Sequence, residues 1–124
     1  MGKIMFENYE VKSANIDEKI YYLNEGIYDT LEELQENTKN LEYYIYEKKD
    51  NKYYAYIALT LSEDIKNKLL DYFKEYDPNV IEEYIDNEKL ITSLNEYDEL
   101  LKQDNDIKEN IINGLKKYEE VLND

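Results

Sequence analysis

The stretch that decides the fold reads Leu41-Glu-Tyr-Tyr-Ile-Tyr-Glu47, then Lys48-Lys-Asp-Asn-Lys52, then Tyr53-Tyr-Ala-Tyr-Ile-Ala-Leu-Thr-Leu61. Two runs rich in aromatic and branched residues, which favour strands, flank a polar five-residue link. This pattern predicts a β-hairpin over residues 41–61.

The hairpin has two predicted faces, because successive side chains of a strand point to opposite sides. The first face carries Leu41, Tyr43 and Ile45, opposite Ala55, Ile57, Leu59 and Leu61. The second face carries Tyr44, Tyr46, Tyr54 and Tyr56. If exposed, these four tyrosines would form a protein-binding surface, whereas under a layer of helices they would belong to the core. A third explanation is an AT-rich genome, whose codons favour tyrosine and asparagine without any selection for function.

The chain before the hairpin predicts further strands and one helix. Residues 4–12 alternate loosely, which indicates one strand or two short ones. Residues 19–28 predict a second small hairpin, with a short helix from Ile16 as the competing interpretation. Thr30 and Glu33 form a capping box, which predicts a helix that runs to about Lys39.

The chain after the hairpin predicts helices. Ser62 is a helix cap, and the next helix carries an apolar stripe of Ile65, Leu69, Tyr72, Phe73 and Tyr76. Asp77-Pro78 is typical of a helix start, so a helix with Val80, Ile81, Tyr84 and Ile85 inside is expected. The apolar period then continues over Leu90, Ile91, Leu94, Tyr97 and Leu101, after a break near Asn87 or at a Ser93–Glu96 box. A turn at residues 104–106 precedes a final helix, whose apolar positions are Ile107, Ile111, Leu115, Tyr118 and Leu122.

These elements predict an α+β fold: a small antiparallel sheet of about four strands in residues 3–61, with one intervening helix, and a C-terminal set of three to four helices packed on one face. We expect a single domain over residues 1–124, in which 1–61 is mostly sheet and 62–124 is an acidic helical part. At 124 residues the chain is long enough to bury a core.

The charge limits the classes of partner. The chain has 30 acidic residues against 15 lysines and no arginine, for a net charge of −15. Such a field repels nucleic acid and anionic membranes and attracts basic surfaces. We therefore expect a basic protein as partner, with no direct binding to nucleic acid or membrane. No apolar run reaches the length of a membrane span and no signal peptide is evident, so a cytoplasmic protein is expected.

The residues that most enzymes use are missing. The chain has no histidine and no cysteine, and its three glycines build no phosphate-binding loop. Asp104-x-Asp106 opens like a calcium loop, but Lys108 stands at the fifth position and no glycine follows. We therefore expect no enzyme activity, no cofactor and no metal.

The sharpest feature is the acidic stretch from Glu75 to Asp106, which holds 11 acids and two lysines. Carboxylates three or four residues apart on a helix lie about 5–6 Å from one another, a spacing comparable to that of phosphates along a nucleic acid. The candidate partner-binding residues are Glu82, Glu83, Asp86, Glu88, Glu96, Asp98 and Glu99, together with the four tyrosines of the hairpin. The simplest alternative is a solvated acidic surface that only maintains solubility.

The expected function is a non-catalytic binding or inhibitor protein that blocks a basic nucleic-acid-binding enzyme, such as a nuclease or a CRISPR effector. In size, charge and lack of catalytic groups the chain resembles phage-encoded DNA-mimic inhibitors, although no motif identifies a family. The first alternative is an immunity protein or antitoxin that neutralises a basic toxin. The second is a hydrolase built on paired carboxylates.

Overall fold

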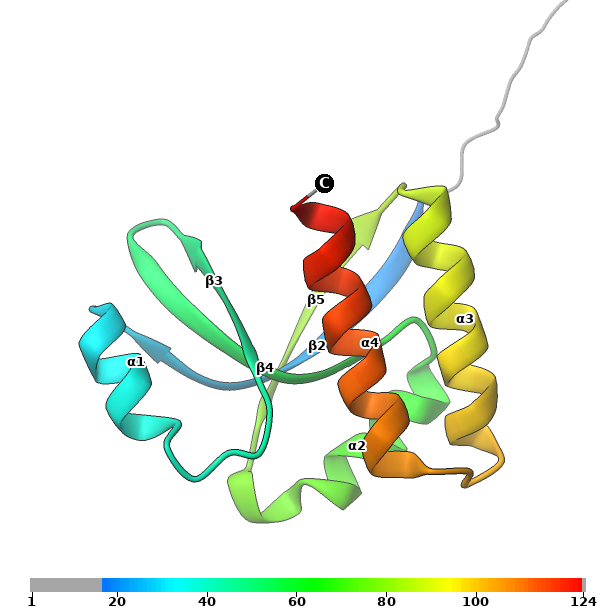
Figure 1. Ribbon diagram of the computed structural model, residues 1–124, viewed down its shortest axis with the longest axis horizontal. Helices are drawn as coiled ribbons and strands as arrows, with labels where there is room; N and C mark the ends of the chain where they lie inside the picture. Colours follow the sequence, from blue (N-terminus) through cyan, green and yellow to red (C-terminus); the bar gives the residue numbers. More distant parts are fainter. Residues whose placement is uncertain (1–16, 124) are drawn as a thin grey trace, which may run out of the picture.

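The computed structural model describes residues 17–123. In chain order the elements are β2 (Glu18–Tyr28), α1 (Leu31–Asn37), β3 (Ile45–Lys49), β4 (Lys52–Thr60), α2 (Glu63–Tyr72), the 3-10 turn η2 (Lys74–Tyr76), β5 (Asn79–Ile85), α3 (Glu88–Lys102) and α4 (Ile107–Leu122) (Figure 1). The four strands form one antiparallel sheet in the order β3-β4-β2-β5. The predicted α+β class is confirmed, with one helix between β2 and β3 and three after β4. The strand predicted in residues 4–12 lies outside the described residues.

The predicted hairpin is confirmed, but its turn is shorter than predicted. Lys49 pairs with Lys52, so the turn contains only Asp50 and Asn51, whose φ angles are 52° and 64°. Asp and Asn tolerate this left-handed region better than other non-glycine residues, and two such residues in a row make the tight turn that suits twisted hairpins.

The shorter turn shifts the register by one residue, and this overturns the predicted faces. Ile45 pairs with Tyr56 and Tyr46 pairs with Ala55, so Ile45 shares its face with Tyr56 and not with Ala55. Because the side-chain period of a strand is two, a slip of one residue moves every side chain of one strand to the other face.

The predicted hairpin in residues 19–28 is wrong, and so is the competing short helix. The segment is the single eleven-residue strand β2, which lies between β4 and β5. Its pairing with β4 is irregular around Asn24 and Gly26. These two residue types are typical of turns, and here they mark a bulge inside a continuous strand.

The helix predicted after Asp77-Pro78 is also wrong, because residues 79–85 form the edge strand β5. Asp77 adopts a left-handed conformation with φ 47°, which ends η2, and does not cap a helix. Residues 79–85 then pair in register with β2, from Asn79 opposite Asn24 to Ile85 opposite Glu18. Tyr84, expected inside a helix stripe, is 68% exposed. The acidic C-terminal part is therefore not wholly helical.

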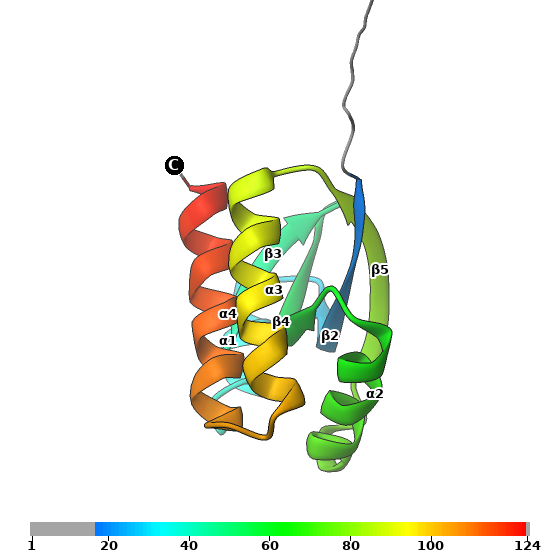
Figure 2. The ribbon, with the colours of Figure 1, turned by 90° about the vertical axis from the view of Figure 1, so that its right-hand side faces the viewer.

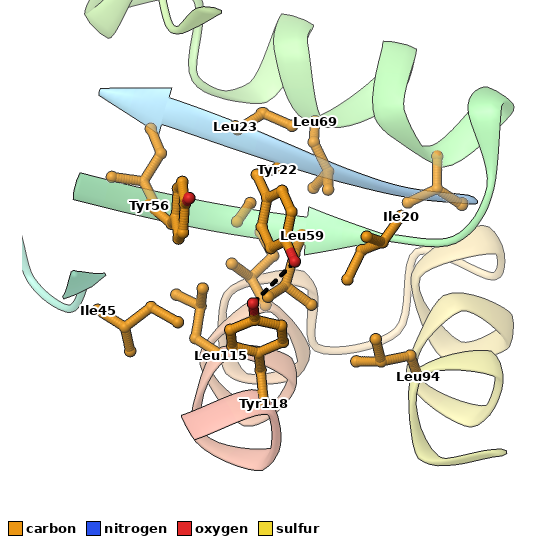
Figure 3. Close-up of a cluster of buried hydrophobic side chains, with 14 of the residues drawn as sticks. Ile20, Tyr22, Leu23, Ile45, Tyr56, Leu59, Leu69, Leu94, Leu115 and Tyr118 are labelled. Atoms are coloured by element: carbon orange, nitrogen blue, oxygen red, sulfur yellow. Dashed lines mark hydrogen bonds between the residues drawn. The ribbon is translucent and has the colours of Figure 1, made fainter. Parts of the chain in front are cut away.

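Helices cover both faces of the sheet, which corrects the expectation that they pack on one. Figure 3 shows β2 and β4 between two layers, with Leu69 of α2 on one side and Leu94 of α3 with Leu115 of α4 on the other. Figure 2 shows the same arrangement from the side, with α3 and α4 together and α2 apart from them. Residues 55–60 of β4 are consequently buried without a break. Burial of both faces of the central strands makes this pair the centre of the core.

Candidate functional site: an acidic face and an aromatic groove

The exposed side of α3 carries three of the predicted partner-binding carboxylates. Asn87 caps this helix, since its side-chain oxygen accepts a hydrogen bond from the Leu90 N–H at 2.9 Å. The apolar positions then turn toward the core, while Glu88, Glu96 and Glu99 remain in solvent. None of the three takes part in an ion pair with another described residue.

Three further carboxylates lie beside this helix. Asp86 is in the two-residue link between β5 and α3, and Glu18 pairs with the preceding Ile85. Glu18 and Asp64 line a hollow of about 300 Å³ between α3 and the start of α2, together with Asp98 and Glu99. Figure 2 looks onto this side of the molecule, with α3, α2 and the start of β2 turned to the viewer. We call this surface the acidic face and define it by the exposed residues Glu18, Asp64, Asp86, Glu88, Glu96 and Glu99.

Asp98, predicted to bind a partner, is buried and has a structural role. Its Oδ1 accepts a hydrogen bond from the Thr60 hydroxyl at 2.6 Å, and its Oδ2 accepts one from the Leu61 N–H at 3.0 Å. Burial raises the pKa of this carboxyl to about 6, against the opposing effect of the two hydrogen bonds. Only 9% of the residue is exposed. Asp98 therefore does not belong to the exposed carboxylates of this helix.

The two glutamates of β5 are placed differently from the α3 carboxylates, because each already has a lysine partner. Glu82 lies 3.3 Å from the ammonium of Lys19 on β2. Glu83 forms an ion pair with Lys49 of β3, across the sheet face between the two edge strands. The predicted partner-binding carboxylates from Glu82 to Glu99 thus fall into two groups. Those on β5 are neutralised by lysines, whereas the exposed ones on α3 have no described lysine partner.

The four hairpin tyrosines do not form one exposed patch. Tyr56 is fully buried, and its ring stacks on Tyr22 with centroids 4.5 Å apart. Tyr44 and Tyr54 are half-buried, and only Tyr46 is largely exposed. The core explanation of this set is therefore confirmed for Tyr56.

A polar network in the core was not anticipated from the sequence. The hydroxyls of Tyr22 and Tyr118 are 2.8 Å apart (Figure 3). Tyr56 and Tyr118 both donate to the carboxylate of Glu47, at 2.9 Å and 3.4 Å. Burial raises the pKa of all three tyrosines well above the usual value of 10. They therefore remain protonated hydrogen-bond donors, and this chemistry does not produce a tyrosine nucleophile at neutral pH.

An aromatic groove of about 300 Å³ lies between α4, the segment before β3 and the end of α2. Its aromatic residues are Tyr43, Tyr72, Phe73 and Tyr76. The sequence places the last three in one helix stripe, but α2 ends at Tyr72 and η2 redirects the chain. This early end leaves Tyr72 and Tyr76 exposed at the groove instead of buried in the core. Neither the apolar residues of this predicted helix nor their spacing in the sequence predicts the groove.

The charged groups at the groove are Glu42, Glu75 and Lys108. The Lys108 ammonium lies 2.8 Å from Glu42 Oε2. This hydrogen bond and the charge of Glu42, with a smaller contribution from Tyr72, raise the pKa of Lys108 above its usual value. The groove thus places a cation beside aromatic rings and a carboxylate.

Within residues 17–123, no three acidic side chains are arranged to hold a metal ion. In the same part of the chain, no helix has the length and apolar content that a membrane span requires. Comparison with family models, with curated proteins and with solved structures finds no match to this chain.

Proposed function

We propose that this protein is a non-catalytic binding protein whose acidic face blocks a basic surface on another protein. The expected partner is a nucleic-acid-binding enzyme, such as a nuclease or a CRISPR effector. The observation that carries the proposal is the grouping of six exposed carboxylates on one side of the molecule, none of which has a described lysine partner.

None of the six carboxylates of the acidic face has a described ion pair, whereas lysines neutralise some of the acids elsewhere on the described surface. Ion pairs elsewhere include Lys39 with Glu36, Lys52 with Asp29 and Lys68 with Asp104, while other exposed acids outside the acidic face, such as Glu32 and Glu109, form no described ion pair. On α3 itself, Lys89 and Lys102 are exposed but form no ion pair with its glutamates. Like charges gathered in this way repel one another and cost stability, and a basic partner surface relieves that repulsion.

The geometry fits a short row of basic side chains. Glu88 and Glu96 are eight residues apart, which separates them by about 12 Å along the helix axis at 1.5 Å per residue. Glu96 and Glu99 are neighbours on the helix surface, about 5–6 Å apart. Such a row resembles a few phosphates of one strand, and a groove that binds a nucleic-acid backbone through lysine and arginine presents complementary charges.

The test is a capture experiment with the intact protein and two matched triple variants. The first variant replaces Glu88, Glu96 and Glu99 by glutamine, and the control replaces Glu32, Glu109 and Glu119, which are exposed on other helices and form no described ion pair. A nuclease-treated lysate of cells that carry the protein supplies the partner. The DNA binding of the captured protein is then measured with and without this chain.

We expect a basic protein that is captured by the parent and the control, is lost with the α3 variant, and is released steeply by salt. Its binding to DNA should fall when the acidic protein is added. Capture that is unaffected by salt and by the α3 variant would overturn the proposal. A captured basic toxin that binds no nucleic acid would favour the immunity-protein alternative.

A further inference from the structure

The aromatic groove exposes large rings that the core does not need. Tyr72 and Tyr76 are 47% and 44% exposed, and both line the groove. Phe73 lies between them in a chain of ring contacts, with centroid separations of 4.9 Å to Tyr72 and 6.1 Å to Tyr76. Exposed tyrosines that are held by neighbouring rings offer their faces to a ligand at a low cost in conformational entropy.

The groove already contains a cation of this chain, the ammonium group of Lys108. Lys108 lines the groove and pairs with Glu42, and both side chains are more than half exposed. An ion pair with this exposure contributes about 0–1 kcal/mol, so an external cation can replace Lys108 at little cost. Glu75 at the same groove has no ion pair within the described part of the chain, and so a second carboxylate is open to that cation.

Arginine fits these groups better than lysine does. Its planar guanidinium stacks on aromatic rings and donates two parallel hydrogen bonds to a carboxylate, while an ammonium is a point charge with stronger hydration. The groove, at about 300 Å³, is at the small end of ligand pockets, which suits one long side chain. The chain has no arginine of its own that could compete for binding in the groove.

We propose that the groove between Tyr72, Tyr76 and Glu75 binds an arginine side chain of the basic partner. This inference rests on the proposed function, because it names the group by which that partner is anchored. The acidic face supplies long-range attraction, and the groove supplies a short-range contact that distinguishes arginine from lysine. The net charge of −15 provides the charge complementarity for such a partner.

The experiment uses three five-residue peptides, capped at both ends, that differ only in a central arginine, lysine or citrulline. Citrulline keeps the shape of arginine without its charge. Each peptide is titrated into the full chain, and the ring signals of Tyr72, Phe73 and Tyr76 are followed by NMR. We expect the ring signals to shift most with arginine, less with lysine and least with citrulline.

Variants locate the contact. Y76L keeps apolar bulk but removes the ring face, and E75Q removes a charge. Each variant should therefore lower the affinity for the arginine peptide by about five- to tenfold. K108Q removes the internal cation and should tighten binding a few-fold. The control is Y84L, which alters an exposed tyrosine on β5 that does not line the groove, and it should leave the affinity unchanged.

Equal binding of the citrulline peptide, or an affinity that does not change in Y76L and E75Q, would overturn the inference. The same holds if the peptide moves only the backbone signals of Glu88, Glu96 and Glu99, which would leave the acidic face as the whole site. Conversely, a partner whose capture needs Tyr76 but none of the α3 glutamates would retain the groove and refute the proposed function of the acidic face.

Discussion

Asp98 connects the end of β4 to α3, and it does so with a carboxyl whose pKa is raised by burial. The two hydrogen bonds to Thr60 and Leu61 favour the ionised form, yet loss of hydration outweighs them. The folded protein therefore holds a proton on Asp98 between pH 3.8 and about 6, where an unfolded chain has released it. Because the native state binds more protons in this window, the contribution of Asp98 to stability falls as the pH rises through it.

We expect the D98N variant to lose this dependence. In the parent, Asp98 should reduce the free energy of unfolding by about 3 kcal/mol between pH 4 and pH 7, from a shift of about two pKa units. Urea unfolding at several pH values measures the effect. The control is E96Q, which changes an exposed carboxylate of the same helix. An identical pH profile for D98N and the parent would show that folding does not raise the pKa of Asp98.

The hydroxyl of Tyr118 bridges β2 and β3 through its contacts with Tyr22 and Glu47. Y118F retains the ring but leaves the buried Tyr22 and the half-buried Glu47 with one hydrogen bond fewer each. We expect a loss of about 1–2 kcal/mol in the free energy of unfolding, measured in urea. Y84F, at the exposed tyrosine of β5, serves as control and should have no effect.

At the scale of elements, α4 contains a glycine that lowers the stability of the helix. Gly114 lies inside this helix, and a Cβ at that position would meet Leu59 and Leu94 at 3.8 Å, an ordinary contact distance. G114A should therefore stabilise the protein by about 1 kcal/mol, since alanine is the better helix former and the space is sufficient. Thermal unfolding measures the gain.

The valine at the same position provides the contrast for this prediction. G114V adds two further methyl groups between α4, β4 and α3, where side chains already touch, and should destabilise the protein. If G114A lowered the melting temperature as G114V does, the approach of α4 to the sheet would be closer than the contacts at Gly114 indicate.

The sequence was sufficient for the helices whose signals are local. Thr30 accepts from the Glu33 N–H, and Ser62 accepts from the Ile65 N–H, as their capping patterns predict. Of the two predicted breaks, the one near Asn87 is observed, because Asn87 caps α3. The final helix begins at Ile107 as expected. Caps and turns involve residues within four positions of one another, so they are readable in a single chain.

The sequence was insufficient where a partner strand decides the structure. Residues 79–85 satisfy a helical period, but pairing with β2 makes them a strand, and propensity is weak against such tertiary contacts. The same error placed Glu82 and Glu83 on a helix with the α3 carboxylates. Of the predicted partner-binding residues, those on α3 lie in solvent as expected, except Asp98, which the long-range contact with Thr60 buries.

At the scale of the whole molecule, repulsion among carboxylates opposes the fold. The net charge of −15 is spread over 124 residues, and the acidic face has no described ion pairs to offset it. Salt screens exposed charges over a distance of about 10 Å at 0.1 M. We therefore expect the protein to be more stable at higher ionic strength.

The prediction is a rise in melting temperature of roughly 4 °C between about 20 mM and 300 mM NaCl, equivalent to about 1 kcal/mol for a chain of this size. The triple variant of Glu88, Glu96 and Glu99 should show a smaller rise, because part of the repulsion has been removed. A melting temperature that falls with salt would mean that the ion pairs, and not the repulsion, dominate the electrostatics.

The central position of β2 has a consequence for synthesis of the chain. Its two neighbours are residues 53–60 and residues 79–85, and α3 and α4, which cover one face, follow later still. A nascent chain released only as far as residue 61 therefore presents one open strand edge and uncovered apolar side chains. Such edges pair readily with other chains. The nascent chain therefore remains prone to aggregation until β5, α3 and α4 have emerged from the ribosome.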